Sequence, residues 1–309
     1  MKVKVFVVPV EFTDYTADKM PLGREGTKND IYNAVFGDGS GTYHESLSSF
    51  YSKSSHGQCK ISGVVTEWFN PGVSSKSISI KNTGYAGKLA GLIYDYYTTG
   101  EGAGTYDMSE YDANKDGLID SLVMIYTPPY TTTGEIWWAF RTSTNTGMPS
   151  SGIPTFYDFF WCSYRFFYEG YSDNQIKSGE FKPDSHTLIH EFGHVLSLPD
   201  YYVTDYAKGD YSGTGGLDMM DMNIGDHNSV SKAWYGWVEP YVIDQDFTIE
   251  INSTTDTGEF VIVPLAGNEF TTLLDQYIVI EFLTPTGVAV KDGQQKLNGS
   301  YESIRTRNK

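Results

Sequence analysis

The chain has 309 residues, of which 39 % are hydrophobic and 15 % aromatic, and its formal net charge is −17. This composition is typical of a globular protein with a sizeable core and argues against a disordered chain. Nucleic acids and anionic membrane surfaces both require a basic face, so neither is an expected partner. No stretch approaches 18 consecutive apolar residues, so no membrane span is expected.

The first half of the chain is predicted to mix strands and helices. The apolar run at residues 3–11 indicates a buried strand rather than a signal peptide, because Pro9 interrupts it and Glu11 follows without a small-residue cleavage site. We therefore expect any export signal to be absent from this chain. Helices are predicted at residues 29–36, 44–53 and 88–97, and strands at 57–65, 119–126, 136–140 and 156–161, the last two at sheet edges.

The pattern changes after Pro240. Before it, helices are predicted at residues 185–197 and 228–237; after it, strands are predicted at 248–251, 260–263 and 276–282. We therefore predict an α/β (α+β) fold with one domain over residues 1–240 and a β-rich, incomplete C-terminal extension over 241–309.

Residues 190–200, HEFGHVLSLPD, carry the strongest chemical signal. On a helix, His190 and His194 lie one turn apart on the same face and can bind one zinc ion. Glu191 lies beside them, where a carboxylate can act as general base on a zinc-bound water. The segment therefore predicts the minimal equipment of a zinc peptidase.

The residues after the second histidine supply a candidate third ligand. Pro199 disfavours helical geometry at the residue before it, so the helix should end there and Asp200 can fold back toward the metal. Two histidines and one carboxylate leave a fourth position open, as in catalytic zinc sites. A structural zinc site is usually rich in cysteine, whereas the only cysteines, Cys59 and Cys162, lie far from the motif.

A second motif, DANKDGLID, occupies residues 112–120. Its oxygen-bearing side chains follow the first positions of a calcium loop, with Gly117 where the sharp turn needs glycine. The candidate ligands are Asp112, Asn114, Asp116 and Asp120. The last ligand position holds Val123 instead of a bidentate Glu. The pattern leaves two interpretations open: a structural calcium site, or an acidic turn that caps the following strand.

Several segments together resemble the immune inhibitor A family of secreted bacterial zinc metallopeptidases. HEFGHVLSLPDYY is similar to its H-E-[FY]-G-H-x-L-G-L-P-D segment, and DANKDGLIDSLVMIY to its strand entry. GGLDMMDMNIGDHNSVSKAWYGWVEP resembles its Asp-x-Met turn and the following helix. SLSSFYSKSSHGQCKISG resembles an early helix-to-strand segment, and QYIVIEFLTPTG a strand beyond the catalytic core. The likeness covers roughly residues 3 to 290 and is more specific than H-E-x-x-H alone.

The resemblance implies a metzincin-like zinc metallopeptidase domain over residues 1–240, with a mixed twisted sheet, a backing helix and an active-site helix. It also implies secretion, and a methionine turn below the zinc. The matching positions are His190, His194 and Asp200 as zinc ligands, Glu191 as general base, and Met220 as the turn methionine, with Met219 adjacent as the alternative.

The chain departs from the family pattern at two points. Ser197 stands where metzincins have a glycine, and a non-glycine residue at positive φ is disfavoured, so the turn is expected to differ or to be strained. This leaves Asp205, Asp218, Asp221 or a more distant Glu open as substitutes for Asp200. The second departure is length, since family members usually carry a signal peptide, a propeptide and further β domains.

The predicted function is a zinc-dependent endopeptidase that hydrolyses internal peptide bonds of proteins or peptides. One rival is a non-catalytic binding or adhesion module that retains the fold; such a module would typically lose Glu191 or a ligand. Another is a deformylase-like amidohydrolase, which would require a cysteine ligand. Three other features have two interpretations each. His186 either donates a hydrogen bond to a metal ligand or lies on the helix surface. His227 is a hydrogen-bonding residue or a ligand, and residues 156–167 form a wall of the substrate site or part of the core.

Overall fold

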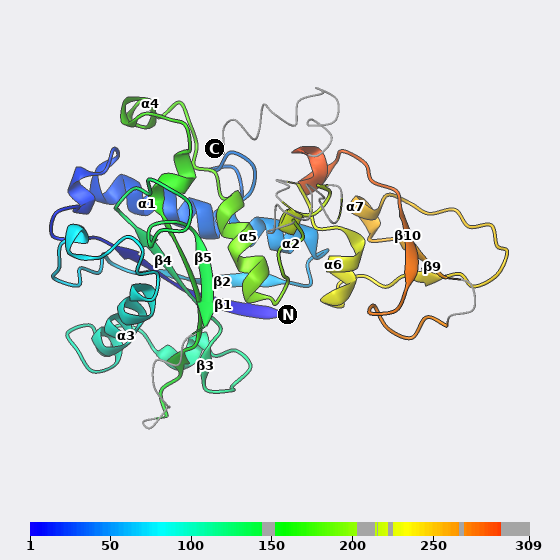
Figure 1. The fold of residues 1–309 in the computed structure, drawn as a ribbon, viewed down its shortest axis with the longest axis horizontal. Coiled ribbons are helices and arrows are strands. Elements are labelled where there is room, and N and C mark those ends of the chain that lie inside the picture. The colour runs from blue at the N-terminus through cyan, green and yellow to red at the C-terminus, as the bar shows by residue number, and fades with distance from the viewer. Residues whose placement is uncertain (144–151, 203–213, 215, 222–224, 266–268, 292–309) are drawn as a thin grey trace. The chain divides into compact units, whose positions relative to one another are not determined.

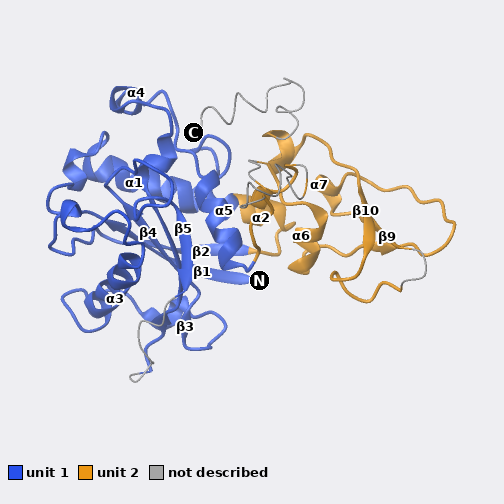
Figure 2. Cartoon of the chain, viewed as in Figure 1, with its two compact units in different colours: residues 1–49, 60–197, 309 blue, residues 50–59, 198–308 orange. Residues whose placement is uncertain are grey.

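The computed structural model describes residues 1–143, 152–202, 214, 216–221, 225–265 and 269–291 (Figure 1). The chain divides into two compact units (Figure 2). Unit 1 contains residues 1–49 and 60–197, and unit 2 contains residues 50–59 and the described residues from 198 onward. The predicted domains, 1–240 and 241–309, stay a prediction, because the lower part of a peptidase domain and a C-terminal extension can both lie in unit 2.

Unit 1 is built on a five-stranded mixed sheet in the order β2-β1-β4-β7-β5. The strands are β1 (Lys2–Val10), β2 (Lys60–Val65), β4 (Ser121–Tyr126), β5 (Phe140–Ser143) and β7 (Asp158–Ser163). All neighbours pair in parallel except β5, which runs antiparallel to β7. Every residue of the central strand β4 is buried, as expected for a continuous apolar run inside a parallel sheet. The predicted mixed α/β class is thereby confirmed.

Helices cover the two faces of this sheet. Helix α3 (Tyr85–Thr98) buries apolar residues at helical spacing, and these pack in one cluster with Phe159 and Trp161 of β7. Successive residues of a strand point to opposite faces, so Phe160 points away from α3. Its ring lies 6.5 Å from the ring of Phe192 in helix α5 (His186–Val195). The sheet therefore holds α5 on the face opposite α3 (Figure 1).

The remaining elements of unit 1 are short, apart from α1 (Gly23–Phe36). Helix α2 (Leu47–Ser54) begins in unit 1 and contributes residues 50–54 to unit 2. Strands β3 (Leu118–Ile119) and β6 (Thr155–Phe156) form a parallel pair. Helix α4 spans Asp173–Lys177, and 3₁₀ helices span Ala17–Lys19, Ser75–Ser77, Met108–Tyr111 and Tyr164–Tyr168.

Unit 2 has a smaller sheet with strand order β10-β9-β8. Its strands are β8 (Tyr241–Val242), β9 (Phe260–Pro264) and β10 (Tyr277–Glu281). Its helices are α6 (Ser229–Trp234) and α7 (Thr254–Thr257), with 3₁₀ turns at Met219–Asp221 and Gly287–Ala289. Val238, Phe260 and Ile262 form the centre of the core beside the sheet.

Several predicted elements in unit 1 have to be corrected. Residues 136–139 are not a strand: Trp138 N–H bonds to the carbonyl of Glu135 in a turn, and the edge strand β5 begins only at Phe140. The strand predicted at 156–161 exists as β7, but its predicted position at the edge of the sheet is wrong, because β7 lies between β4 and β5. The predicted strand 119–126 is interrupted at Asp120, whose carboxylate accepts backbone N–H groups from two other segments.

Two predictions in unit 2 are also wrong. Residues 248–251 form no strand, and the sheet of unit 2 consists of β10, β9 and β8 among the described residues. The helix predicted at 228–237 ends at Trp234, and Gly236 follows with φ +69°, a left-handed conformation in which helices commonly end. In addition, the single-turn helix α7 lies in the region predicted to hold strands only.

Within the described residues, no helix combines the length and the hydrophobicity needed to cross a bilayer.

Candidate metal centre

Helix α5 presents the two motif histidines together. Its buried side carries Leu188, Ile189 and Phe192, which pack into unit 1, whereas His190 and His194 remain half-buried. The imidazole rings lie one turn apart in an edge-to-face arrangement, with centroids 4.9 Å apart and planes at 87°. The apolar residues of the segment therefore fix the helix against the sheet, and this leaves the two imidazoles available on the same side.

The end of α5 turns sharply at Ser197, whose φ is +76°. Its N–H bonds to the carbonyl of His194 at 2.9 Å, and the next residue, Leu198, is buried. A left-handed residue just after the last helical turn commonly ends a helix and redirects the chain, and this position usually holds glycine. Ser197 therefore adopts the left-handed conformation that is disfavoured for a residue with a Cβ. The turn allows Asp200, six residues after His194, to return toward the helix.

The returning chain completes a three-residue cluster. One ligand atom from each of His190, His194 and Asp200 lies within 4.8 Å of the other two. Ligands at about 2.0–2.1 Å from a tetrahedral zinc stand about 3.3 Å apart, so the three atoms would have to move closer together to share one ion. Two imidazoles and one carboxylate also match the donor set of catalytic zinc sites. The cluster could therefore hold a metal ion, and its donor set is one that zinc accepts.

The candidate base Glu191 lies between the two histidines in sequence and is buried, with 7 % of its surface exposed. Burial raises the pKa of the Cys162 thiol in β7, and the negative charge of Glu191 raises it further.

Two of the alternative third ligands have other roles. The Asp218 carboxylate accepts hydrogen bonds from the N–H groups of Met220 and Asn228, at 2.7 and 2.9 Å. The Asp221 carboxylate accepts hydrogen bonds from Thr214 N–H and Oγ1 at 3.1 and 2.6 Å. Asp205 lies outside the described residues. Asp200 is therefore the carboxylate that the described geometry favours.

The candidate methionine turn is a 3₁₀ turn over Met219–Asp221. Both methionine side chains are buried, so burial alone does not distinguish them. The backbone of Met220 is held on both sides, since its N–H bonds to Asp218 and its carbonyl accepts the N–H of Tyr201 at 2.9 Å. The assignment of Met220 as the turn methionine stays a prediction.

His227 and His186, the other two histidines considered as candidates, do not belong to this cluster. His227 is buried, and its Nδ1 lies 3.3 Å from Asp218 Oδ1, which confirms the interpretation as a hydrogen-bonding residue. His186 lies one turn before His190 and forms an ion pair with Asp184 at 3.3 Å. Burial opposes protonation of His186, but Asp184 and Glu169 outweigh it and raise the pKa above the ordinary 6.5. It is thus a partly buried, paired histidine.

The loop at residues 112–120 uses its acidic side chains as backbone caps. Asp112 accepts the N–H groups of Asp116 and Gly117, at 3.0 and 2.9 Å. Asp120 accepts those of Ala113 and Lys4, at 3.0 and 2.8 Å. These bonds fit the capping interpretation. The four predicted oxygen ligands, Asp112, Asn114, Asp116 and Asp120, remain a calcium prediction, and among the described residues the three aspartates do not meet the 4.8 Å spacing.

The aromatic run at residues 156–167 belongs to the core. Its six Phe and Trp side chains are at most 5 % exposed, so they cannot line a substrate groove. They are Phe156, Phe159, Phe160, Trp161, Phe166 and Phe167. Tyr157, by contrast, is exposed.

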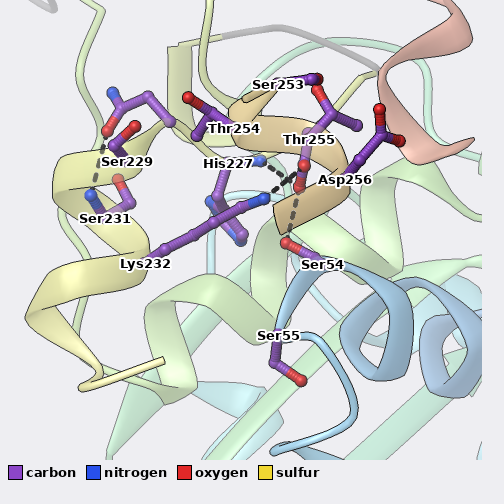
Figure 3. A network of polar contacts seen from close by, with 12 residues as sticks. Ser54, Ser55, His227, Ser229, Ser231, Lys232, Ser253, Thr254, Thr255 and Asp256 are labelled. Atoms are coloured by element: carbon purple, nitrogen blue, oxygen red, sulfur yellow. Dashed lines mark hydrogen bonds and ion pairs between the residues drawn. The ribbon is translucent and has the colours of Figure 1, made fainter. Parts of the chain in front are cut away.

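Sequence reasoning missed two polar assemblies in unit 2. The sequence offers Asp218 only as a substitute ligand, whereas in the structure it is a buried hydrogen-bond acceptor for several segments. The second is a buried ion pair between Lys232 and Asp226 at 2.5 Å, joined by the Ser54 hydroxyl at 2.6 Å (Figure 3). The available signal was the density of Asp, Ser and Lys in an otherwise apolar helix-forming segment.

No protein-family model matches this sequence, and no curated protein shows a significant match to it.

Proposed function

We propose that this chain is a zinc-dependent endopeptidase of a metzincin-like type that hydrolyses internal peptide bonds. The observation that carries the proposal is the cluster of His190, His194 and Asp200, with Glu191 between the histidines on one helix. A mixed sheet with helices on both faces, and a helix that ends in a left-handed turn, are compatible with such a domain.

The proposed roles follow from the chemistry of each side chain. His190, His194 and Asp200 hold the metal; when bound, zinc supplies Lewis-acid polarisation of the scissile carbonyl and acidifies water. Glu191 accepts a proton from the attacking water and then donates it to the leaving amine. Glu191 is buried and directly follows His190 in the chain, which is compatible with a carboxylate that acts close to the metal.

The test is hydrolysis of casein by the purified full chain with stoichiometric zinc. We expect activity that a chelator removes and zinc restores. Glu191→Gln keeps the size of the side chain but cannot accept the proton, so it should retain zinc and lose about 10²- to 10⁴-fold in turnover. Glu110→Gln is the matched control, because Glu110 is an exposed carboxylate paired with Lys4 at 3.0 Å.

Each rival function has its own outcome. Zinc binding at full occupancy without cleavage of any protein would favour the binding or adhesion module. Cleavage of small formylated amides without cleavage of casein would favour the amidohydrolase. Full activity of Glu191→Gln would contradict the proposed mechanism.

A further inference from the structure

A buried carboxylate organises the chain around the candidate methionine turn. Asp218 has none of its surface exposed. Its Oδ1 accepts the N–H of Met220 at 2.7 Å and lies 3.3 Å from Nδ1 of His227. Its Oδ2 accepts the N–H of Asn228 at 2.9 Å and the hydroxyl of Ser231 at 2.7 Å. A carboxylate offers about four acceptor positions, so the polar capacity of Asp218 is filled.

This arrangement favours the charged form of Asp218. Burial by itself raises the pKa of this carboxyl, but His227 and the hydrogen bonds from Ser231 and Met220 outweigh burial and hold the pKa below the ordinary value. The ring of His227 is enclosed by Phe50 and Tyr51, with centroids 5.7 and 5.8 Å away. The carboxylate therefore lies in a buried environment in which several groups donate hydrogen bonds to it.

The same hydrogen bonds continue to the residue that follows the candidate third ligand. Met220, whose N–H is held by Asp218, accepts the backbone N–H of Tyr201 through its carbonyl at 2.9 Å. The Tyr201 hydroxyl lies 3.1 Å from Oγ of Ser231, which donates to Asp218. Tyr201 is thus connected to Asp218 through Met220 at its backbone and through Ser231 at its side chain. Asp200 directly precedes Tyr201 in the chain.

We propose that Asp218 is a positioning residue that sets the place of the Asp200 carboxylate by holding Tyr201 through Met220 and Ser231. This inference rests on the proposed function, in which Asp200 is a metal ligand. Outer groups that orient a ligand commonly contribute about 10- to 100-fold to metal affinity. The need to hold Tyr201 in place also gives a physical reason for an aspartate two residues before the candidate turn methionine.

The experiment measures the zinc dissociation constant of the full chain by competition with a chelating dye. Asp218→Asn removes the charge at constant shape, and the amide presents a donor to groups that are themselves donors. We expect about 10- to 100-fold weaker zinc binding, and a shifted visible spectrum of the cobalt-substituted protein. Ser231→Ala removes one contact and should weaken binding by a smaller factor without the loss of a buried charge.

The control is Asp226→Asn, which neutralises another buried carboxylate of unit 2. Two of its partners, Ser54 and Lys232 (Figure 3), lie outside the hydrogen bonds that lead from Asp218 to Tyr201. The third is the backbone N–H of His227, which the side-chain oxygen of an asparagine can still accept. We expect this variant to lose stability but, where it is folded, to bind zinc as the wild type does. A similar loss of zinc affinity in Asp226→Asn would show that general loosening of unit 2 is responsible, and would overturn the proposal.

The decisive step is to repeat the measurement with Asp200→Ala. If Asp218 acts through Asp200, Asp218→Asn or Ser231→Ala should cause no further loss there; an equal loss in both backgrounds would overturn the proposal. Unchanged affinity in both variants with intact Asp200 would refute this inference alone. A wild-type chain that binds no zinc, or that binds it equally after His190→Ala, would refute the proposed function and the inference with it.

Discussion

Replacing Ser197 with glycine should stabilise the protein, because Ser197 holds φ +76° at the end of α5. The left-handed conformation costs a non-glycine residue about 1–2 kcal/mol, since its Cβ approaches the neighbouring carbonyl. Glycine removes this strain but gains about 0.5–1 kcal/mol of freedom in the unfolded chain. The difference predicts a net stabilisation of about 0.5–1 kcal/mol for Ser197→Gly.

The side chain of Ser197 is exposed, so a substitution series reports on the backbone rather than on packing. Asparagine tolerates the left-handed region and should fall between glycine and serine. Alanine keeps the Cβ and should match serine, whereas β-branched valine should be the least stable. The stability order is therefore Gly, Asn, Ser with Ala, then Val. Urea unfolding at constant pH measures it, and thermal unfolding should shift by about 1–3 °C for glycine.

Two results would refute this reasoning. If Ser197→Ala stabilises as much as glycine, the serine hydroxyl rather than the Cβ is responsible. If glycine destabilises the protein, then the turn is not strained, and the folding back of Asp200 requires another explanation. Zinc affinity of the glycine variant should remain at the wild-type value, since the backbone path to Asp200 is unchanged.

Three further predictions concern buried ionisable groups. Lys232→Met should lower the free energy of unfolding in urea by about 3 kcal/mol, because Asp226 loses its cation but keeps two hydrogen bonds. The double variant Lys232→Met with Asp226→Leu should recover most of this loss, and no recovery would contradict the pairing. His186 has a raised pKa because the Asp184 charge outweighs burial, so its stabilising effect is present below pH 6.5 and is lost as pH rises through the folded pKa. Accordingly, the stability difference between wild type and His186→Gln should shrink from pH 6 to pH 9, and a constant difference would count against it. Burial raises the pKa of Cys59 to about 11, and both cysteines are free and buried, so thiol labelling at pH 8 should require denaturant; rapid labelling of the native protein would disagree.

The elements that could be predicted are those whose pattern is contained in a short stretch of the sequence. Helix α3 follows from the spacing of Leu89 and Ile93, and β4 from the apolar run at residues 122–126. The turn after α5 was predictable in position because of Pro199 and the departure at Ser197. These signals act over a few residues, so no knowledge of the tertiary structure is needed to detect them.

The missed features depend on which segments meet in three dimensions. Residues 136–139 have the apolar composition of a strand, yet Trp161 Nε1 donates to the carbonyl of Ile136 and the chain turns there. The role of Asp218 depends on hydrogen bonds with four other residues, the farthest 13 positions away. A sequence pattern identifies such a residue as acidic and candidate ligand, but it does not reveal that its lone pairs are already used.

Unit 2 combines two stretches that lie far apart in the sequence, and this has a consequence for the synthesis of the protein. Ser54 bonds to Asp226 across 172 positions, and Gln58 bonds to the carbonyl of Trp237 across 179. At about 5–20 residues per second, the ribosome would produce these partners roughly 10–35 s apart. During that interval, apolar side chains such as Phe50 and Tyr51, buried in the finished unit, lack their later partners. Synthesis therefore creates a waiting period in which a chaperone that shields residues 50–59 would raise the yield of folded protein.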